Sequence, residues 1–459
     1  MKRFCLPLLL TSVVIIIKAQ LPQVYLNGSF GYEYNEGEIC IVDSDTTRLK
    51  ANIKWRGGST NSDGKHKRNY KIKLSEDVSL LGLREDNNWI LDAGQADLFR
   101  LRNRIATDLW NDFAEKPYYS HKKPDVLTGT NGRVVEVYLN NDYMGIYCLT
   151  EVIDRKQLKL KKYKNNTING QLWKSEGYGC ALMWHILPYD NQSETWDVFE
   201  VKYPDLDDLN TTDYSTLYNA INFVVNSSNE VFTDQVDEYF DMPVLIDYYI
   251  FLQTMNAYDN IGKNIYWATY DKNEDKKLTL AVWDLDATVG QKWTDKFIAG
   301  SSSPEYDINI NMKLYVRLTE LDVNDFNKKV SERYFQLRKN YLSTDSLINR
   351  YISYYDLIKR SGAIKREEDK WSKDTDIDGE ELNFDSELNY IIDWFTRHMS
   401  YLDKKMSSIS NDIKVVLNHQ THYYYNLNSQ RIIRKPSNKG LYIKDGKKYI
   451  ISKYRKMLE

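Results

Sequence analysis

Apolar and polar residues alternate through much of the first 150 residues, which predicts β-strands with one buried face. The alternation is clear in 49–55 and again in 69–74. Arg56-Gly57-Gly58-Ser59 follows the first of these segments, so the pair is expected to form a β-hairpin with a long tip. Shorter strand-like fragments fall in 24–34, and residues 89–91 are expected to form a third strand.

A second hairpin is expected from the alternating segments 134–139 and 144–149. They flank Asn140-Asn141-Asp142, and these residue types tolerate the positive φ that tight turns require. Between the two hairpins the apolar spacing changes to the helical period. A helix is therefore expected over 97–113, with Asp97 as its N-cap.

Helical spacing dominates the second half of the chain. Helices are expected at about 214–225 and 242–255, the second being the most apolar of the mature chain, and most of 303–412 is also expected to be helical. Strands are expected at 171–173, 265–270 and 278–283. From residue 423 onward, short alternating segments around Asp445-Gly446 predict a small separate β module.

The composition is that of a globular protein. The 459 residues are 42% hydrophobic and 28% charged, which is enough for a two-lobed domain with small additions. The formal net charge is −3, so the chain lacks the positive excess of nucleic-acid-binding proteins, and nucleic acid is not an expected partner.

The N-terminus has the order of a secretory signal. Met1-Lys2-Arg3 precedes an apolar run over 4–17, and Lys18-Ala19-Gln20 follows, so cleavage is expected after Ala19. That run is too short to cross a bilayer comfortably, and no later stretch approaches ~18 uncharged apolar residues, so no transmembrane segment is expected. We expect export to the periplasm, the cell surface or the medium.

The mature chain would contain three cysteines, Cys40, Cys148 and Cys180. An odd number cannot form a complete disulfide framework, although one bridge, for example Cys148 to Cys180, fits the count. The chain has no CxxC pair, and we identify no histidine ligand near the cysteines, so structural zinc is not expected.

The residues with the clearest chemical meaning follow the apolar helix at 242–255. Asp259 and Asn264 stand five residues apart in a polar loop, then comes the predicted hairpin of 265–283, and Asp284-Leu285-Asp286 follows it. Protein kinases place a base Asp, a metal-binding Asn and a metal-binding Asp in this order. In this interpretation Asp259 is the base, Asn264 and Asp284 hold Mg²⁺, and Asp286 is a second or alternative ligand.

Two simpler interpretations compete with this one. Asp and Asn are common in polar loops for turn reasons alone, so the spacing of Asp259 and Asn264 also occurs by chance. The turn at 271–275 is rich in acidic residues and invites a Ca²⁺ site, but it lacks the spacing and the final Glu of an EF-hand loop. We interpret it as a solvated turn.

Several spaced motifs resemble the spore coat protein H (CotH) kinase family, over most of the chain from about residue 49 to 406. They are Trp55-Arg56-Gly57-Gly58-Ser59, Lys67-Arg68-Asn69-Tyr70-Lys71-Ile72-Lys73-Leu74, Leu101-Arg102-Asn103, Val137-Tyr138-Leu139-Asn140, Met144-Gly145-Ile146-Tyr147, Leu149-Thr150-Glu151-Val152-Ile153-Asp154 and Trp283-Asp284-Leu285-Asp286. The resemblance implies an atypical protein kinase that uses ATP and Mg²⁺ (or Mn²⁺) on Ser residues of extracytoplasmic or coat proteins. By position, Asp259 resembles the family's catalytic Asp and Asp284 its metal-binding Asp.

The resemblance also implies an α+β, two-lobed, atypical protein-kinase-like fold. The expected organisation is a signal peptide at 1–19, an N-terminal β segment at 20–48, the CotH kinase-like domain at 49–410 and a C-terminal β module at 411–459. That module resembles the sorting tails of some exported proteins that use type IX secretion, and a plain appended hairpin is the equal alternative.

Four residues are candidates for contacting the nucleotide. Lys73 and Lys174 are both candidates for pairing with phosphate, and Glu151 is a candidate for orienting that lysine. Arg56 has the same ambiguity, because most lysines and arginines are solvated surface residues. The chain departs from ordinary kinases in having Tyr258 before the base and Leu285-Asp286 after the metal-binding Asp.

The expected function is transfer of the γ-phosphoryl group of ATP to Ser hydroxyls of an exported or surface protein. One alternative is a catalytically weak pseudokinase whose aromatic-rich surface, with 36 Tyr and 11 Trp, binds a protein or a glycan. Another is a nucleotide-dependent enzyme that transfers AMP.

Overall fold

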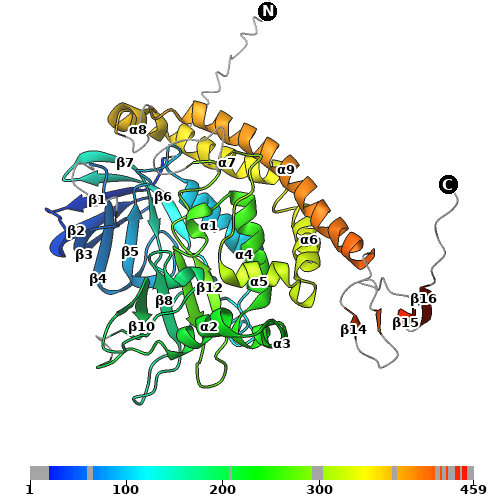
Figure 1. The fold of residues 1–459 in the computed structure, drawn as a ribbon. Helices are drawn as coiled ribbons and strands as arrows, with labels where there is room; N and C mark the ends of the chain where they lie inside the picture. Colours follow the sequence, from blue (N-terminus) through cyan, green and yellow to red (C-terminus); the bar gives the residue numbers. More distant parts are fainter. Residues whose placement is uncertain are drawn as a thin grey trace, which may run out of the picture. The chain divides into compact units, whose positions relative to one another are not determined.

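The computed structural model describes residues 20–58, 66–205, 209–291, 303–374, 380–418, 424–425, 431–432, 440–444 and 447–451. The predicted signal peptide at 1–19 lies outside them. The chain divides into two compact units, Met1–Lys404 and Lys405–Glu459. The expected α+β class is confirmed, and both β-sheets of the first unit are packed with helices (Figure 1).

Seven strands form a closed barrel in the first unit, in the order β1-β2-β3-β4-β5-β7-β6. The two predicted hairpins are both present, and Asn140 and Asn141 have positive φ at the turn between β6 and β7. The barrel closes where β1 runs parallel to β6. The segment 20–48, expected as a separate β element, is thus part of the barrel. The strands are β1 (Gln23–Asn27), β2 (Asn35–Val42), β3 (Thr46–Arg56), β4 (Asn69–Ser79), β5 (Glu85–Asp92), β6 (Gly132–Leu139) and β7 (Asp142–Thr150).

The alternation along β4 separates two faces of the barrel. Tyr70, Ile72 and Leu74 are buried in its apolar core, where they join Trp89 and Leu91 of β5. Because side chains alternate along a strand, Lys71 and Lys73 point away from that core. Lys71 pairs with Ile90 of β5, which lies against a second apolar cluster, so the outer face at this position is covered by other parts of the unit.

Helix α1 (Arg102–Phe113) begins five residues later than the sequence pattern suggests. Asp97 was the expected N-cap, but residues 97–100 form a turn in which the Asp97 carboxylate accepts a hydrogen bond from the backbone N–H of Phe99. The same carboxylate also accepts from the backbone N–H of Arg102, the first residue of the helix. Asp97 therefore still binds the helix start, across a loop that the apolar spacing did not reveal.

A second, antiparallel sheet has the order β12-β11-β8-β10-β9. Its strands are β8 (Gln171–Ser175), β9 (Thr195–Trp196), β10 (Phe199–Tyr203), β11 (Ile265–Thr269) and β12 (Thr279–Val282). Lys174 lies inside β8 rather than at its end. Every residue of β11 and β12 is buried, which explains why these strands show no alternation in the sequence.

The helices predicted in the second half are present. Helix α4 matches its expected bounds, and the region from residue 303 onward is mainly helical in the described part. The helices are α2 (Ser215–Asn226), α3 (Asn229–Tyr239), α4 (Met242–Met255), α5 (Lys313–Glu320), α6 (Phe326–Leu337), α7 (Thr344–Ser361), α8 (Ala363–Trp371) and α9 (Phe384–Asn418). In the second unit, four short strands form a sheet in the order β14-β13-β15-β16: β13 (Tyr424–Tyr425), β14 (Arg431–Ile432), β15 (Gly440–Lys444) and β16 (Lys447–Ile451).

Buried ion pairs connect the barrel and α1 to the C-terminal helices of the first unit. The guanidinium of Arg102 binds the carboxylates of Asp97 at 2.7 Å and of Glu387 in α9. Glu367 of α8 accepts from Arg100 at 2.8 Å and forms an ion pair with Lys67 at 2.9 Å. The side chains in both clusters are at most 2% exposed.

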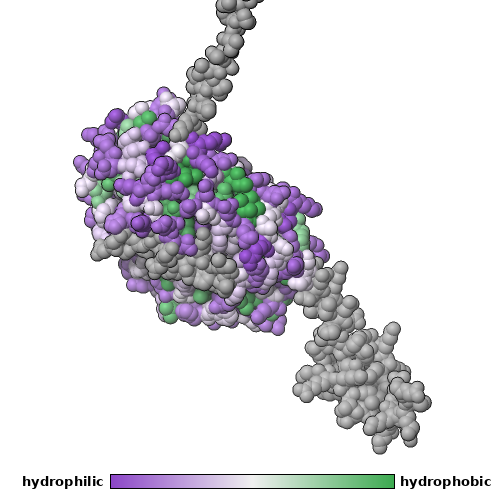
Figure 2. Space-filling model, turned by 90° about the horizontal axis from the view of Figure 1, so that it is seen from above, coloured by the Kyte–Doolittle hydropathy of each residue, from purple (hydrophilic) through white to green (hydrophobic). Residues whose placement is uncertain are grey.

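The face seen in Figure 2 is mostly hydrophilic, with hydrophobic side chains in small separate groups. None of the helices in the described residues is both long enough and apolar enough to cross a membrane.

Replacing Arg102 by Met is expected to lower the free energy of unfolding by about 3–5 kcal/mol, because Asp97 and Glu387 would remain buried without their counter-charge. Urea denaturation monitored by tryptophan fluorescence measures the change. Arg350→Met is the matched control, because Arg350 pairs with Asp112, which is 49% exposed, and such pairs contribute about 0–1 kcal/mol. Equal effects of the two substitutions would contradict the prediction.

Asp241→Asn is expected to stabilise the protein at neutral pH. Burial raises the pKa of Asp241, which precedes α4, to about 6, although the backbone N–H of Tyr118 donates to its carboxylate at 2.8 Å. An acid whose pKa rises on folding is favoured in its protonated form, so its ionisation costs stability above the folded pKa, up to about 3 kcal/mol. The gain from Asp241→Asn should be full above about pH 6 and should fade towards pH 4.

Urea denaturation of both proteins across that pH range provides the measurement. The exposed Asp234 of α3 gives the control variant Asp234→Asn, for which no comparable pH-dependent gain is expected. A gain from Asp241→Asn that does not change with pH would show that the carboxylate is not the cause.

Candidate active site

The loop that carries Asp259 is shaped by the way α4 ends. Asn256 adopts the left-handed conformation that commonly ends a helix, with φ 50°. The chain then forms a single 3₁₀ turn, Tyr258–Asn260, with Asp259 at its centre. Asp259 is only 5% exposed.

Three side chains donate hydrogen bonds to the carboxylate of Asp259. Tyr178 donates its hydroxyl to Oδ1 at 2.7 Å, and Lys263 and Asn264 donate to Oδ2 at 3.0 and 2.9 Å. Asn264 has φ 59°, and its backbone N–H donates to the carbonyl of Ser175 at the end of β8. The structure thus brings together Asp259 and Asn264, the base and metal ligand expected from the sequence.

Asn260 joins this loop to the strand that precedes Asp284. Its side-chain amide donates to the carbonyl of Trp283 at 2.8 Å, and its own carbonyl accepts from the hydroxyl of Tyr248 in α4 at 2.6 Å. Asn260 is completely buried. The residues next to Asp259 and Asp284 are therefore joined by a direct hydrogen bond.

Asp284 and Asp286 lie in a backbone segment of unusual shape. Asp284 has φ 58° and Val289 has φ 53°, which is rare for a β-branched residue. The backbone N–H of Val289 donates to the carbonyl of Met255 at 2.8 Å, and the carbonyl of Thr288 accepts from Arg102 at 3.2 Å. Strained backbone held by surrounding contacts is characteristic of functional sites.

The carboxylates of this region repel one another. The surface of Asp284 is partly accessible to solvent at the pocket. Many protein atoms nevertheless surround its carboxylate, and the resulting loss of hydration raises its pKa. The charges of Asp92 and Asp259 raise that pKa further, while Lys174 and Arg56 lower it. The pKa of Asp286 is raised well above its ordinary range by burial first and then by the charge of Asp284.

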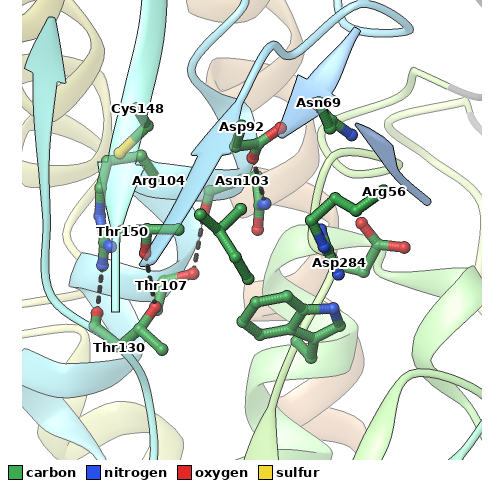
Figure 3. A pocket seen from close by; sticks show the side chains of 12 residues that line it. Arg56, Asn69, Asp92, Asn103, Arg104, Thr107, Thr130, Cys148, Thr150 and Asp284 are labelled. Carbon is green, nitrogen blue, oxygen red and sulfur yellow. Dashed lines mark hydrogen bonds between the residues drawn. The ribbon is translucent and has the colours of Figure 1, made fainter. Parts of the chain in front are cut away.

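Asp92 and Asn103 lie next to these carboxylates, but the sequence does not indicate either of them as a site residue. Asn103, on the first turn of α1, donates to Asp92 at the end of β5 at 2.7 Å and accepts from the backbone N–H of Leu285 at 3.0 Å (Figure 3). It thereby links the barrel to the segment that carries Asp284. Asn103 belongs to the family motif Leu101-Arg102-Asn103, but the sequence assigns no function to it.

A polar pocket opens between the outer face of the barrel, α1 and the end of β12. Arg56 and Asp284 lie beside each other at one end, and Arg104, Thr130 and Thr150 line the other (Figure 3). The guanidinium of Arg56 lies over the ring of Trp283, 5.4 Å from its centre. Of the four residues that the sequence suggests as nucleotide contacts, Arg56 lines this pocket.

The three lysines of interest have different surroundings. Lys174 ends near Asp284, lowers its pKa, and donates to Glu176 at 2.7 Å. Lys71 is half-buried on the outer face of the barrel, where burial and the charges of Lys202, Arg56 and Lys54 lower its pKa. Lys73 lies two residues farther along β4 and is exposed. The sequence pointed to Lys73, but Lys71 is the one that belongs to the cation group around Arg56.

Glu151 has a different set of contacts from those expected. Its carboxylate accepts from the backbone N–H groups of Arg84 at 3.2 Å and of Asn131 at 2.8 Å, and it is 1% exposed. Within the described residues, no hydrogen bond or ion pair joins it to Lys73 or Lys174. These contacts favour a role in fixing two loops of the barrel over the orientation of a lysine.

Cys40, Cys148 and Cys180 are all buried and free, so the bridge considered between Cys148 and Cys180 is not formed. At the 271–275 turn, Lys161 pairs with Asp271, and Lys122 pairs with Glu274. Both carboxylates therefore already have counter-charges, but only part of the turn is solvated, because Glu274 is exposed whereas Asp271 is completely buried.

The donor set around Asp284 fits a hard divalent cation. Asp284 and Asp286 offer carboxylate oxygens of the type that Mg²⁺ takes, and Asn264, whose side-chain NH₂ donates to Asp259, offers an amide oxygen. The carboxylates of Asp284 and Asp286 repel each other in the protein alone, and a bound cation would relieve this repulsion.

Mn²⁺ is therefore expected to raise the melting temperature of the wild type and to have little effect on Asp284→Asn. Binding at one hundred times the dissociation constant contributes about 2.7 kcal/mol. With EDTA present, Asp284→Asn should be at least as stable as the wild type, because one of the repelling charges is gone. Differential scanning fluorimetry provides the measurement, and Glu274→Gln, at an exposed position of the 271–275 turn, should keep the wild-type response. A full Mn²⁺ response in Asp284→Asn would contradict this assignment.

The model of the family described as CotH kinase protein matches residues 53–402, which include the barrel from β3 onward, the second sheet, Asp259 and Asp284. A search of curated proteins finds no match. Since the matched range covers well over half of the sequence, the chain belongs to the CotH kinase protein family.

Proposed function

We propose that this chain is an exported protein kinase that transfers the γ-phosphoryl group of ATP to Ser hydroxyls of an exported or surface protein. In this proposal the barrel with α1 is one lobe, and the second sheet with its helices is the other. The observation that carries the proposal is the junction between them, where carboxylates around Asp284 lie beside cationic side chains around Arg56. Family membership supports a kinase-like protein.

Asp259 would act as the base. The Tyr178 hydroxyl donates to Oδ1 at 2.7 Å, and a Ser hydroxyl of the substrate would have to take its place. The donors Lys263 and Asn264 hold the other oxygen and thereby fix the orientation of the carboxylate. In the reaction, the Ser oxygen forms a bond to the γ-phosphorus, the bond from that phosphorus to the ADP oxygen breaks, and Asp259 accepts the Ser proton.

The remaining residues would bind the nucleotide. Mg²⁺ held by Asn264, Asp284 and Asp286 would neutralise charge on the phosphates. Arg56, Lys71 and Lys174 would add cations on the other side. Lys71 is the stronger lysine candidate of the barrel, because it is half-buried among Arg56, Lys54 and Lys202. Its pKa is lowered first by burial and then by these positive charges, which a phosphate would compensate.

The decisive test is transfer of labelled phosphate from ATP, with Mg²⁺ or Mn²⁺, to the protein itself and to a Ser-rich acceptor. Asp259→Asn and Asp284→Asn are expected to lower the rate by at least about 100-fold, because each removes a group needed for positioning or charge stabilisation. Glu274→Gln serves as the control with unchanged activity. Product mass separates the alternatives, since a kinase adds one phosphate and an AMP transferase adds a nucleotide. Absence of both transfer and ATP binding in the wild type would favour a pseudokinase that acts as a binding module.

Lys71→Gln and Lys73→Gln form a matched pair on one strand. Loss of Lys71 is expected to weaken ATP binding at least about tenfold, equivalent to roughly 1.4 kcal/mol, whereas loss of the exposed Lys73 should have little effect. Titration with a fluorescent ATP analogue gives both affinities. The opposite order would return the phosphate-binding role to Lys73.

A further inference from the structure

Cys180, His185 and Asp197 come together on a part of the molecule separate from the pocket. Cys180 begins the 3₁₀ turn Cys180–Leu182, His185 follows it in the next loop, and Asp197 lies between β9 and β10. One potential ligand atom of each, the thiol sulfur, a ring nitrogen and a carboxylate oxygen, lies within 4.8 Å of the others. Cys180 is buried, while His185 and Asp197 are exposed.

These three donors suit a borderline transition metal better than Mg²⁺ or Ca²⁺. Zinc takes thiolate, imidazole and carboxylate ligands, whereas the two lighter cations take oxygen. Zinc-to-ligand distances of about 2.0–2.3 Å place tetrahedral ligands roughly 3.3–3.8 Å apart. If the ligand atoms of the exposed His185 and Asp197 side chains moved by about 1 Å, the three donors would reach the ligand-to-ligand spacing of a tetrahedral zinc site.

The local backbone fixes Asp197 next to Cys180. The N–H of Cys180 donates to Oδ2 of Asp197 at 2.5 Å. Gly179 lets the carboxylate approach, because a Cβ at this position would overlap it. Within the described residues, the imidazole of His185 has no recorded hydrogen bond or ion pair, so its ring nitrogens remain available to a metal.

We propose that Cys180, His185 and Asp197 form a site for Zn²⁺, with the fourth position open to water or to another ligand. Binding replaces the thiol proton of Cys180 by the metal and releases that proton to solvent. From the sequence, zinc is not expected here: His185, five residues after Cys180, is not identified as a ligand, and Asp197 approaches only through the fold.

The bound ion would anchor the segment that lies against the loop of Asp259. Tyr178, two residues before Cys180, donates to Asp259, and the Cα of Gly262 faces Leu182 and Ala181 so closely that an added Cβ would lie 3.0 Å from the Leu182 side chain. The inference goes beyond the proposed kinase activity and does not depend on it, because the ligands lie outside the acidic group around Asp284.

The test uses the mature full chain and Co²⁺ as a spectroscopic probe for Zn²⁺. One Co²⁺ per chain is expected, with a thiolate-to-cobalt charge-transfer absorption that Zn²⁺ abolishes by displacement. Cys180→Ser should remove this absorption, and His185→Asn should weaken binding at least about tenfold, because even residues that only support a metal ligand contribute that much. Asp284→Asn should leave the absorption unchanged, which separates this site from the proposed Mg²⁺ site.

Cys40→Ser and His121→Asn are the matched controls, and both are expected to bind like the wild type. His185 is exposed, so His185→Asn remains informative even where Cys180→Ser fails to fold. The proposal is overturned by a wild type that shows no thiolate charge transfer with Co²⁺, or by a charge-transfer band that persists undiminished in His185→Asn.

Discussion

The site depends on the buried guanidinium of Arg102. It binds Asp97 before α1, Glu387 in α9 and the carbonyl of Thr288 just after Asp286, so one side chain connects three distant parts of the chain. Removing a charge of this kind from solvent is costly unless each hydrogen-bonding direction is used. The geometry that satisfies Arg102 is also the geometry that brings the acidic loop against α1.

The contacts of Arg102 fix the start of α1 and therefore also the position of Asn103. As the next residue of α1, it bridges Asp92 of the barrel and the backbone of Leu285. On the other side, Asn260 makes the corresponding link from the loop of Asp259 to Trp283. Amide side chains suit this task because they form hydrogen bonds without adding charge to a region already rich in carboxylates. The strained backbone at Asp284 and Val289 persists because these contacts surround it.

Local patterns predicted much of the fold. The hairpin turn at Asn140-Asn141 and the bounds of α4 follow from turn chemistry and apolar spacing, which act over a few residues. The helix α1 begins later than the sequence predicts because Asp97 binds Arg102 across an irregular turn. Such a contact leaves no periodic pattern in the sequence. Closure of the barrel by β1 and β6 joins strands more than 100 residues apart, which no local pattern can encode.

The sequence by itself determined the order of the chemical groups: the family motifs, and Asp259, Asn264, Asp284 and Asp286 placed around a hairpin. Only the tertiary structure decided which other side chains accompany them. Lys71 and Lys73 are alike in the sequence, and Glu151 is a candidate partner for Lys73 or Lys174. Burial and charge distinguish the two lysines, and two backbone N–H groups occupy Glu151. The same holds for Cys180, His185 and Asp197, because whether donors converge depends on the path of the backbone between them.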